Sequence, residues 1–381
     1  MMDVKSILAK AIEMAASDVH INVGMPPLLR KNTELIEMDI PAISNEDAKE
    51  MVVAMVGPDR YKVFKEKKDL DFSTTLDEGH RFRVNAHYQR ETIAIAFRVI
   101  PNKIPLIRDL HLPAIVEELT DLPRGLVLVT GHTGSGKSTT LAAMVGLINR
   151  KERKHVITLE DPIEYLLEND KCVIEQREIG FDCPTFSSGL RHALRQDPDI
   201  IMVGEMRDLE SSSWTITAAE TGHLVFSTLH TINAPQTIER IIDIYPANQQ
   251  GQIRAMLANT LQAVISQTLF RRIDEPGMVP CTEILLCTSA VRNCIRENRI
   301  YEIPNIIETS RKIGMQNMDG SIADMYFKGF LDREEAITRS NNPAKMDKLL
   351  KPMGEKPETA ESLEEQLIQE QPVEEQAVST E

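Results

Sequence analysis

The sequence of 381 residues lacks several features that would each define a class of protein. Its five cysteines are odd in number and form no Cys-x-x-Cys pair, which argues against a disulfide framework and a four-cysteine zinc site. No run approaches the roughly 20 apolar residues that a membrane helix needs, and the first residues contain no apolar signal-peptide core. We therefore expect buried free thiols, no membrane insertion and a cytoplasmic location.

An excess of basic residues is also lacking. The sequence has 43 Lys and Arg residues against 58 Asp and Glu residues, for a formal charge of -15. A protein whose main task is to bind nucleic-acid phosphates is expected to be basic, so the charge argues against a nucleic-acid partner. Residues 354–381 hold nine glutamates, one lysine and few large apolar groups. We expect them to form a disordered acidic tail.

The N-terminal residues indicate a small α+β domain over 1–100. Apolar residues at helical spacing predict a helix over 3–16. Strict alternation over 81–88 places Arg81 and Arg83 together on the polar face of a strand. The predicted strands of this domain include 19–23, 81–88 and 92–100.

A different pattern begins at about residue 114, after a proline-containing linker predicted at 101–113. Short apolar strands alternate with helical segments, which is typical of a parallel sheet covered by helices. The sequence therefore predicts an α/β domain over 114–353. Its predicted strands are 126–130, 156–159, 199–203 and 224–228.

The strongest local signal lies directly after the strand predicted at 126–130. The residues there match the pattern Gly-x-x-x-x-Gly-Lys-Ser/Thr, and an apolar helical segment follows. Such glycines let backbone N–H groups surround a phosphate, the lysine reaches the β- and γ-phosphates, and the hydroxyl can bind Mg²⁺. We therefore predict ATP and Mg²⁺ as cofactors, with Ser138 as a metal ligand. The predicted nucleotide-binding residues of this loop are Gly131, His132, Thr133, Gly134, Ser135, Gly136, Lys137, Ser138 and Thr139.

Hydrolysis also needs groups that orient water and stabilise charge. In a typical P-loop ATPase an acidic residue directly follows an apolar strand, but here Gly204 separates that strand from Glu205. The carboxylates Glu160 and Glu164 follow the strand predicted at 156–159, at the end where ligands bind in such sheets. These three glutamates are the candidate catalytic carboxylates.

Two histidines flank the strand predicted at 224–228. Either one alone is more often a structural or surface residue than a catalytic one. Together with the phosphate-binding loop, His223 and His230 become candidates for sensing the γ-phosphate.

These segments, in this order, resemble the ring ATPases of type IV pili and type II secretion. In that family Glu160–Glu164 corresponds to an aspartate box, Asp197–Asp208 to an atypical Walker B motif without its first acid, and His223–His230 to a histidine box. The resemblance extends from near the N-terminus to about residue 350. It implies a RecA-like P-loop ATPase core, preceded by a smaller PAS-like α+β domain.

The resemblance also implies roles and partners. Glu164 would activate the water, and Glu205 would assist at the metal and phosphate. Arg81 and Arg83 would face nucleotide at a domain or subunit seam, although the residues alone show only the polar face of a strand. The expected assembly is a homohexamer at the cytoplasmic face of the inner membrane, where it would contact a pilus platform protein.

Within the family the chain resembles the pilus-retraction branch, PilT and PilU. Extension and secretion enzymes usually carry an additional N-terminal region and often a four-cysteine zinc insert, which we do not expect here. The segment Ala290–Glu297 resembles a helix that PilT proteins need for retraction, with Val291 and Cys294 as departures; an ordinary packed helix is the alternative. The acidic C-terminal extension is more typical of PilU, so the subtype stays open.

The expected function is therefore a motor ATPase that retracts type IV pili for twitching motility. One alternative is a pilus-extension or type II secretion ATPase, and another is an accessory PilU-like ATPase with a paralogous pilus ATPase as partner. A nucleic-acid translocase on the same core is a more remote alternative.

Overall fold

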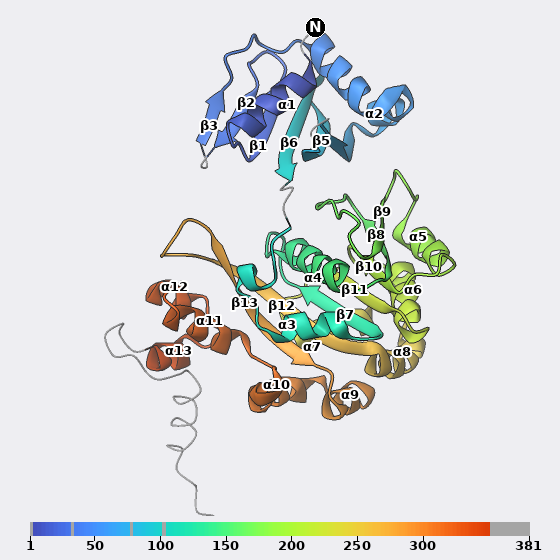
Figure 1. Ribbon diagram of the computed structural model, residues 1–381, viewed down its shortest axis with the longest axis vertical. Coiled ribbons are helices and arrows are strands. Elements are labelled where there is room, and N and C mark those ends of the chain that lie inside the picture. The colour runs from blue at the N-terminus through green and yellow to red at the C-terminus, as the bar shows by residue number, and fades with distance from the viewer. Residues whose placement is uncertain (1–2, 32–33, 77–78, 101–103, 351–381) are drawn as a thin grey trace, which may run out of the picture.

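The computed structural model describes residues 3–31, 34–76, 79–100 and 104–350. Two sheets form the centres of two domains, which follow one another along the chain (Figure 1). The predicted tail at 354–381 and residues 101–103 of the predicted linker lie outside the described residues.

The first domain contains a six-stranded antiparallel sheet with the order β3-β2-β1-β6-β5-β4. The alternation predicted over 81–88 is confirmed in β5, where Phe82, Val84 and Ala86 are buried. This face packs against the helices, so the arginines of β5 lie on the opposite face. The strands are β1 (Asp18–Asn22), β2 (Leu28–Lys31), β3 (Glu34–Glu37), β4 (Asp69–Thr75), β5 (Arg81–Gln89) and β6 (Thr92–Ile100).

Two helices cover that apolar face. The helix predicted over 3–16 is α1 (Val4–Glu13), which contributes Ile7 and Leu8 to the core of the domain. The second, α2 (Asn45–Lys67), begins at a capping box between Ser44 and Asp47. It is interrupted at Gly57, whose φ of 78° is not helical, so α2 consists of two helical segments.

The second domain contains a seven-stranded sheet with the order β13-β12-β7-β11-β10-β8-β9. The pairing is parallel throughout except between β12 and β13. All four strands predicted in this half are present, and three more accompany them. The strands are β7 (Gly125–Thr130), β8 (His155–Glu160), β9 (Val173–Glu178), β10 (Ile200–Val203), β11 (Leu224–Leu229), β12 (Leu261–Arg271) and β13 (Met278–Leu286).

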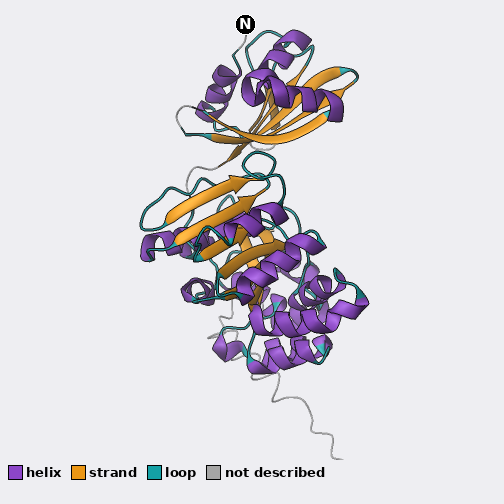
Figure 2. Ribbon diagram, turned by 90° about the vertical axis from the view of Figure 1, so that its right-hand side faces the viewer, coloured by secondary structure: helices purple, strands orange, loops and turns teal. Residues whose placement is uncertain are grey.

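Helices cover both faces of this sheet (Figure 2). Val127 and Val129 of β7 face the core shared with α3 and α4, whereas Leu126 and Leu128 face the core shared with α5 to α10. Burial on both sides explains why these strands are continuous apolar runs rather than alternating ones. The helices are α3 (Ile115–Glu118), α4 (Lys137–Lys151), α5 (Phe186–Ala193), α6 (Leu209–Glu220), α7 (Ala234–Asp243), α8 (Ala247–Thr260), α9 (Ser289–Arg296) and α10 (Ile303–Thr309).

The last helices pack beside the outer ends of β12 and β13 (Figure 1). Phe270, Val279 and Cys281 of these strands join them in a separate apolar cluster. These helices are α11 (Met318–Phe327), α12 (Arg333–Thr338) and α13 (Pro343–Leu349), and short 3-10 turns are η1 (Arg108–Leu110), η2 (Leu119–Asp121), η3 (Ile300–Glu302) and η4 (Arg311–Ile313).

Two further expectations concern the whole chain. The five cysteines are free and buried, as expected. Among the described residues, no helix has the length and apolar character needed to cross a membrane.

Candidate active site

The phosphate-binding loop connects β7 to α4 and passes close to the neighbouring strand β12. A Cβ atom on Gly131 would lie 2.2 Å from the carbonyl oxygen of Gln267, and one on Gly136 would lie 2.7 Å from its Nε2 atom. Both glycines also have positive φ angles, of 141° and 88°. A side chain at Gly131 would meet the backbone of β12, and one at Gly136 would displace the amide of Gln267, so glycine is favoured at both positions.

The side chain of Lys137 folds back onto the phosphate-binding loop and bonds its backbone. Lys137 Nζ donates to the carbonyl oxygens of Gly131 at 2.9 Å and His132 at 3.0 Å. Burial lowers the pKa of Lys137, and the carboxylates of Glu205 and Glu164 oppose this effect. Two of the three predicted catalytic carboxylates thus favour the charged form of this lysine.

The remaining residues of the loop divide into two groups. His132, Thr133 and Gly134 are exposed at its tip, and Ser135 is buried beneath them. Ser138 and Thr139 lie in the first turn of α4, where the backbone N–H groups at the start of a helix favour a phosphate.

Gln267 is a residue of this site that the sequence reasoning missed. It is 3% exposed, and its amide donates to the carbonyl oxygen of Ser135 at 2.7 Å. The same amide accepts the hydroxyl of Thr140 at 2.9 Å. It therefore connects the loop to the first turns of α4. The available signal was a glutamine in the middle of a largely apolar strand, β12.

Glu205 follows β10 at the edge where the loop lies. Its carboxylate accepts Arg207 Nε at 2.7 Å and lies 3.2 Å from His230 Nε2. Arg207 also lies 3.8 Å from Asp161 of the neighbouring loop. The hydrogen bond with Glu205 is the main cause that raises the pKa of Arg207. The structure thus brings Glu205 and His230 together.

His223 lies elsewhere. It precedes β11, and its carbonyl oxygen accepts Gly125 N–H at the start of β7. Its Nδ1 atom lies 2.9 Å from the carbonyl oxygen of Ala218. Because the six residues of β11 rise about 3.3 Å each, His223 is roughly 20 Å from the loop edge. The structure does not bring this candidate to the site of its own subunit.

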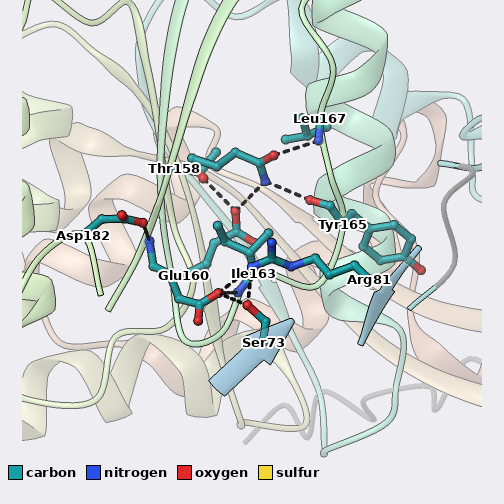
Figure 3. Close-up of polar contacts among 10 residues, drawn as sticks. Ser73, Arg81, Thr158, Glu160, Ile163, Tyr165, Leu167 and Asp182 are labelled. Atoms are coloured by element: carbon teal, nitrogen blue, oxygen red, sulfur yellow. Dashed lines mark hydrogen bonds and ion pairs between the residues drawn. The ribbon is translucent and has the colours of Figure 1, made fainter. Parts of the chain in front are cut away.

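Glu160 is buried at the end of β8 (Figure 3). Its Oε1 atom accepts Thr158 Oγ1 at 2.6 Å and Gln176 Nε2 at 3.0 Å. Burial raises the pKa of Glu160 to about 6, although these hydrogen bonds oppose it. This environment holds the carboxyl beneath the loop that follows β8, whereas Glu164 is half-exposed on that loop.

The loop after β8 also contacts the first domain. Glu164 Oε1 lies 3.7 Å from Arg83 Nη1, and the side chains are 41% and 45% exposed. Arg81 instead lies 2.6 Å from the buried Glu178. Both arginines predicted to face nucleotide therefore contact carboxylates of the second domain. Tyr165 of the same loop bonds Thr139 at 2.9 Å and so reaches α4.

The donor set around the loop consists of oxygens suited to a phosphate-bound metal. Among the described residues, no group of three or more His, Cys, Asp and Glu could hold a metal ion alone. A hydroxyl at Ser138 and a carboxylate at Glu205 are hard oxygen ligands of the kind Mg²⁺ uses beside substrate phosphates and water. The residues present thus fit a metal that arrives with nucleotide.

Comparisons with known proteins agree with this geometry. The sequence model of the family described as type II/IV secretion system protein matches residues 109–322. The protein described as the type IV pilus retractation ATPase PilT of Pseudomonas aeruginosa is 42% identical over 342 residues, which cover 90% of this chain and 99% of that protein. The type IV pilus ATPase PilU of the same organism is 36% identical and covers 90% of this chain and 89% of its own length.

A solved structure gives the same result. In the crystal structure of the pilus retraction motor PilT with bound ADP, the protein chain is 41% identical in sequence to this one. The match has a TM-score of 0.84 and covers 91% of this chain and 100% of the PilT chain. The chain belongs to the type II/IV secretion ATPase family. Within it, the chain falls in the branch of type IV pilus retraction ATPases. The predicted fold, with its RecA-like core, and the predicted ATPase activity are confirmed.

Replacing Glu160 by Gln should stabilise the fold at neutral pH but not at acidic pH. Because the folded-state pKa is about 6 and the ordinary value is 4.5, the contribution of this carboxyl is complete below about pH 4.5. It is lost as the pH rises through 6, a change of about 2 kcal/mol. Glutamine keeps an acceptor oxygen for Thr158 and Gln176.

Thermal unfolding of Glu160→Gln at pH 8 and pH 4.5 measures this difference. The expected result is a higher midpoint than wild type only at pH 8. Glu220→Gln, on an exposed residue at the end of α6, is the control. An equal change at both pH values would contradict the burial of an ionisable group.

Replacing Gln267 by Leu should weaken ATP binding. The change removes both bonds to the loop and α4, and each buried group left unpaired costs about 1–3 kcal/mol. We expect the KM for ATP to rise about tenfold, equivalent to about 1.4 kcal/mol. Gln262→Leu, on the same strand with bonds to Arg124 and Arg292, is a matched control away from the loop. A KM within twofold of wild type would refute the positioning role.

Proposed function

We propose that this chain is the motor subunit of a ring that retracts type IV pili by hydrolysing ATP. The observation that carries the proposal is that one edge of the parallel sheet holds the phosphate-binding loop after β7 and Glu205 after β10, with His230 after β11 3.2 Å from Glu205. It is supported by alignment with PilT, described as a pilus retraction ATPase, over 99% of that protein.

The carboxylates have different roles in this proposal. Glu164 is half-exposed on the loop after β8, so it can accept a proton from the attacking water. Glu205 is held by Arg207 and His230, and in this proposal it assists at the metal and phosphate. Mg²⁺, bound by Ser138, Glu205 and the phosphates, would neutralise charge on the transferred phosphoryl group.

The proposed assembly is a homohexamer at the cytoplasmic face of the inner membrane. Nucleotide at the seam between neighbouring subunits would favour one arrangement of the two domains over another. Binding, hydrolysis and release would thus become domain rotation, which an inner-membrane platform protein transmits to the base of the fibre. The result is disassembly of the pilus and twitching motility.

The helix that resembles the retraction segment has one free face. In α9, Val291, Cys294 and Ile295 are buried, and Arg292 donates to the carbonyl oxygen of Ala258 at 2.6 Å. Asn293 and Arg296 are exposed. An exposed polar face on an anchored helix supports a contact with the retraction machinery.

An accessory role beside a paralogous motor is the second candidate. The observation in its favour is the 36% identity to PilU over 90% of the chain. A PilU-like subunit would need its paralogue for retraction, whereas a PilT-like subunit would retract pili without one.

Replacing Glu205 by Gln should preserve ATP binding and lower turnover at least tenfold. The loss is expected because an amide lacks the negative charge with which Glu205 would hold the metal during phosphoryl transfer. Nucleotide affinity and steady-state hydrolysis are measured on the same sample. Unchanged turnover would show that the catalytic assignment is wrong.

Cells lacking this chain should have excess surface pili and no surface motility. Lys137→Ala should give the same result, because loss of the ammonium removes phosphate binding. Pilus counts by electron microscopy and twitching assays measure both. Cells without pili would indicate extension or secretion, and normal pili with normal motility would reject a principal role in retraction.

A further inference from the structure

Glu178, at the end of β9, connects the two domains. Arg81 and Ser73 of the first domain lie close to Ile163 of the second (Figure 3). Its Oε2 atom accepts Arg81 Nη2 at 2.6 Å and Ser73 Oγ at 2.7 Å, both from the first domain. The same oxygen accepts the backbone N–H of Ile163 at 3.2 Å, within the loop after β8. Arg81 also donates to Ser73. One carboxylate oxygen therefore contacts both the first domain and the loop after β8.

This contact is well shielded from water. The side chains of Arg81 and Glu178 are 13% and 5% exposed. Removing one member of such a pair leaves the other charge unpaired and buried away from water, which is strongly destabilising. A second contact lies three residues further along, where the guanidinium of Arg60 stacks on Phe181 with 3.3 Å to the ring centroid. The end of β9 is thus a docking point for the first domain.

The two ends of the loop after β8 are held differently. At Tyr165 and Leu167 the loop bonds Gln176, which belongs to the same domain. At Ile163 it bonds the carboxylate of Glu178, whose other side-chain partners, Ser73 and Arg81, come from the first domain. Glu164 follows Ile163 directly. The half of the loop that carries Glu164 is therefore the half that also receives support from the first domain, in addition to the bond between the backbone of Glu164 and the Glu160 carboxyl.

The same strand of the first domain contacts this loop twice. Arg81 and Arg83 are two residues apart in β5 and so lie on one face. Arg81 binds Glu178, and Arg83 lies 3.7 Å from Glu164. Fixing Arg81 therefore also fixes the position from which Arg83 faces Glu164.

We propose that Glu178 is a positioning residue through which docking of the first domain sets the placement of Glu164. With the domain docked, Arg81 and Ser73 hold the carboxylate that orients Ile163 N–H. With the domain moved away, this carboxylate is hydrated and free to rotate, and the loop loses the support that it receives at Ile163. Hydrolysis is therefore faster in subunits whose first domain is docked. The inference rests on the proposed role of Glu164 in ATP hydrolysis.

The test uses Arg81→Ala in the full chain. We expect kcat for ATP to fall about tenfold with KM within twofold, because a misplaced catalytic group slows the chemical step while the phosphate-binding loop is unchanged. Arg81→Lys should recover part of the loss, since an ammonium can still bind Glu178. Arg98→Ala is the matched control, because Arg98 of neighbouring β6 pairs with Asp18 within its own domain.

Hydrogen exchange supplies a readout independent of activity. The peptide that contains Ile163 and Glu164 should exchange faster in Arg81→Ala and in Glu178→Gln, while the peptide that contains Lys137 should not change. The double variant should lose no more kcat than the more affected single variant, because both changes break one connection.

Three results would overturn the inference. A raised KM in Arg81→Ala would show that Arg81 binds nucleotide instead. Unchanged exchange at Ile163 would show that the loop does not respond to docking. Faster exchange at both peptides would show general destabilisation. A fully active Glu164→Gln variant with faster exchange in Arg81→Ala would reject the catalytic role of Glu164 and leave the physical link supported.

Discussion

The parallel pairing of β7 with β11, and of β10 with β8, is the constraint on which the site depends. Parallel strands end at the same edge, so the residues that follow them converge although they lie far apart in the sequence. Thr130 pairs with Leu229, and Val203 pairs with Leu159. The phosphate-binding loop, the carboxylates and His230 are therefore gathered at one edge. The same direction of β11 places His223 at the opposite edge.

The sequence allowed prediction of the elements whose burial is uniform. The strands β7, β8, β10 and β11 are covered on both faces, so each reads as an apolar run bounded by polar residues. The edge strand β9 contains Glu175, Gln176 and Glu178 and has no such run. Helix α2 was missed because Gly57 and Pro58 interrupt its apolar spacing. Both β9 and α2 lack the periodicity on which such predictions rest.

In the site, residues that are adjacent in sequence could be predicted, whereas residues that meet only in the folded protein could not. The loop from Gly131 to Thr139 could be identified because its glycines, lysine and hydroxyls are adjacent in sequence. Gln267 and Glu178 could not, because their roles arise from side chains that meet the loops only after the sheet has formed. A polar residue that is buried in a strand is a usable signal in principle, since such a group requires a partner. The partner itself cannot be read from the sequence.

The loop after β8 is supported by Gln176 and by Glu178. The chemistry of these two side chains explains why the first support can be permanent and the second reversible. Gln176 is a neutral amide whose bonds are satisfied within its own domain, so domain motion does not affect them. Glu178 is a carboxylate whose cation belongs to the other domain. Separation returns both charges to water, and their hydration offsets most of the lost attraction. A charged contact across the domains can therefore fix geometry when closed and still open at low cost, which a purely apolar contact of the same area would not allow.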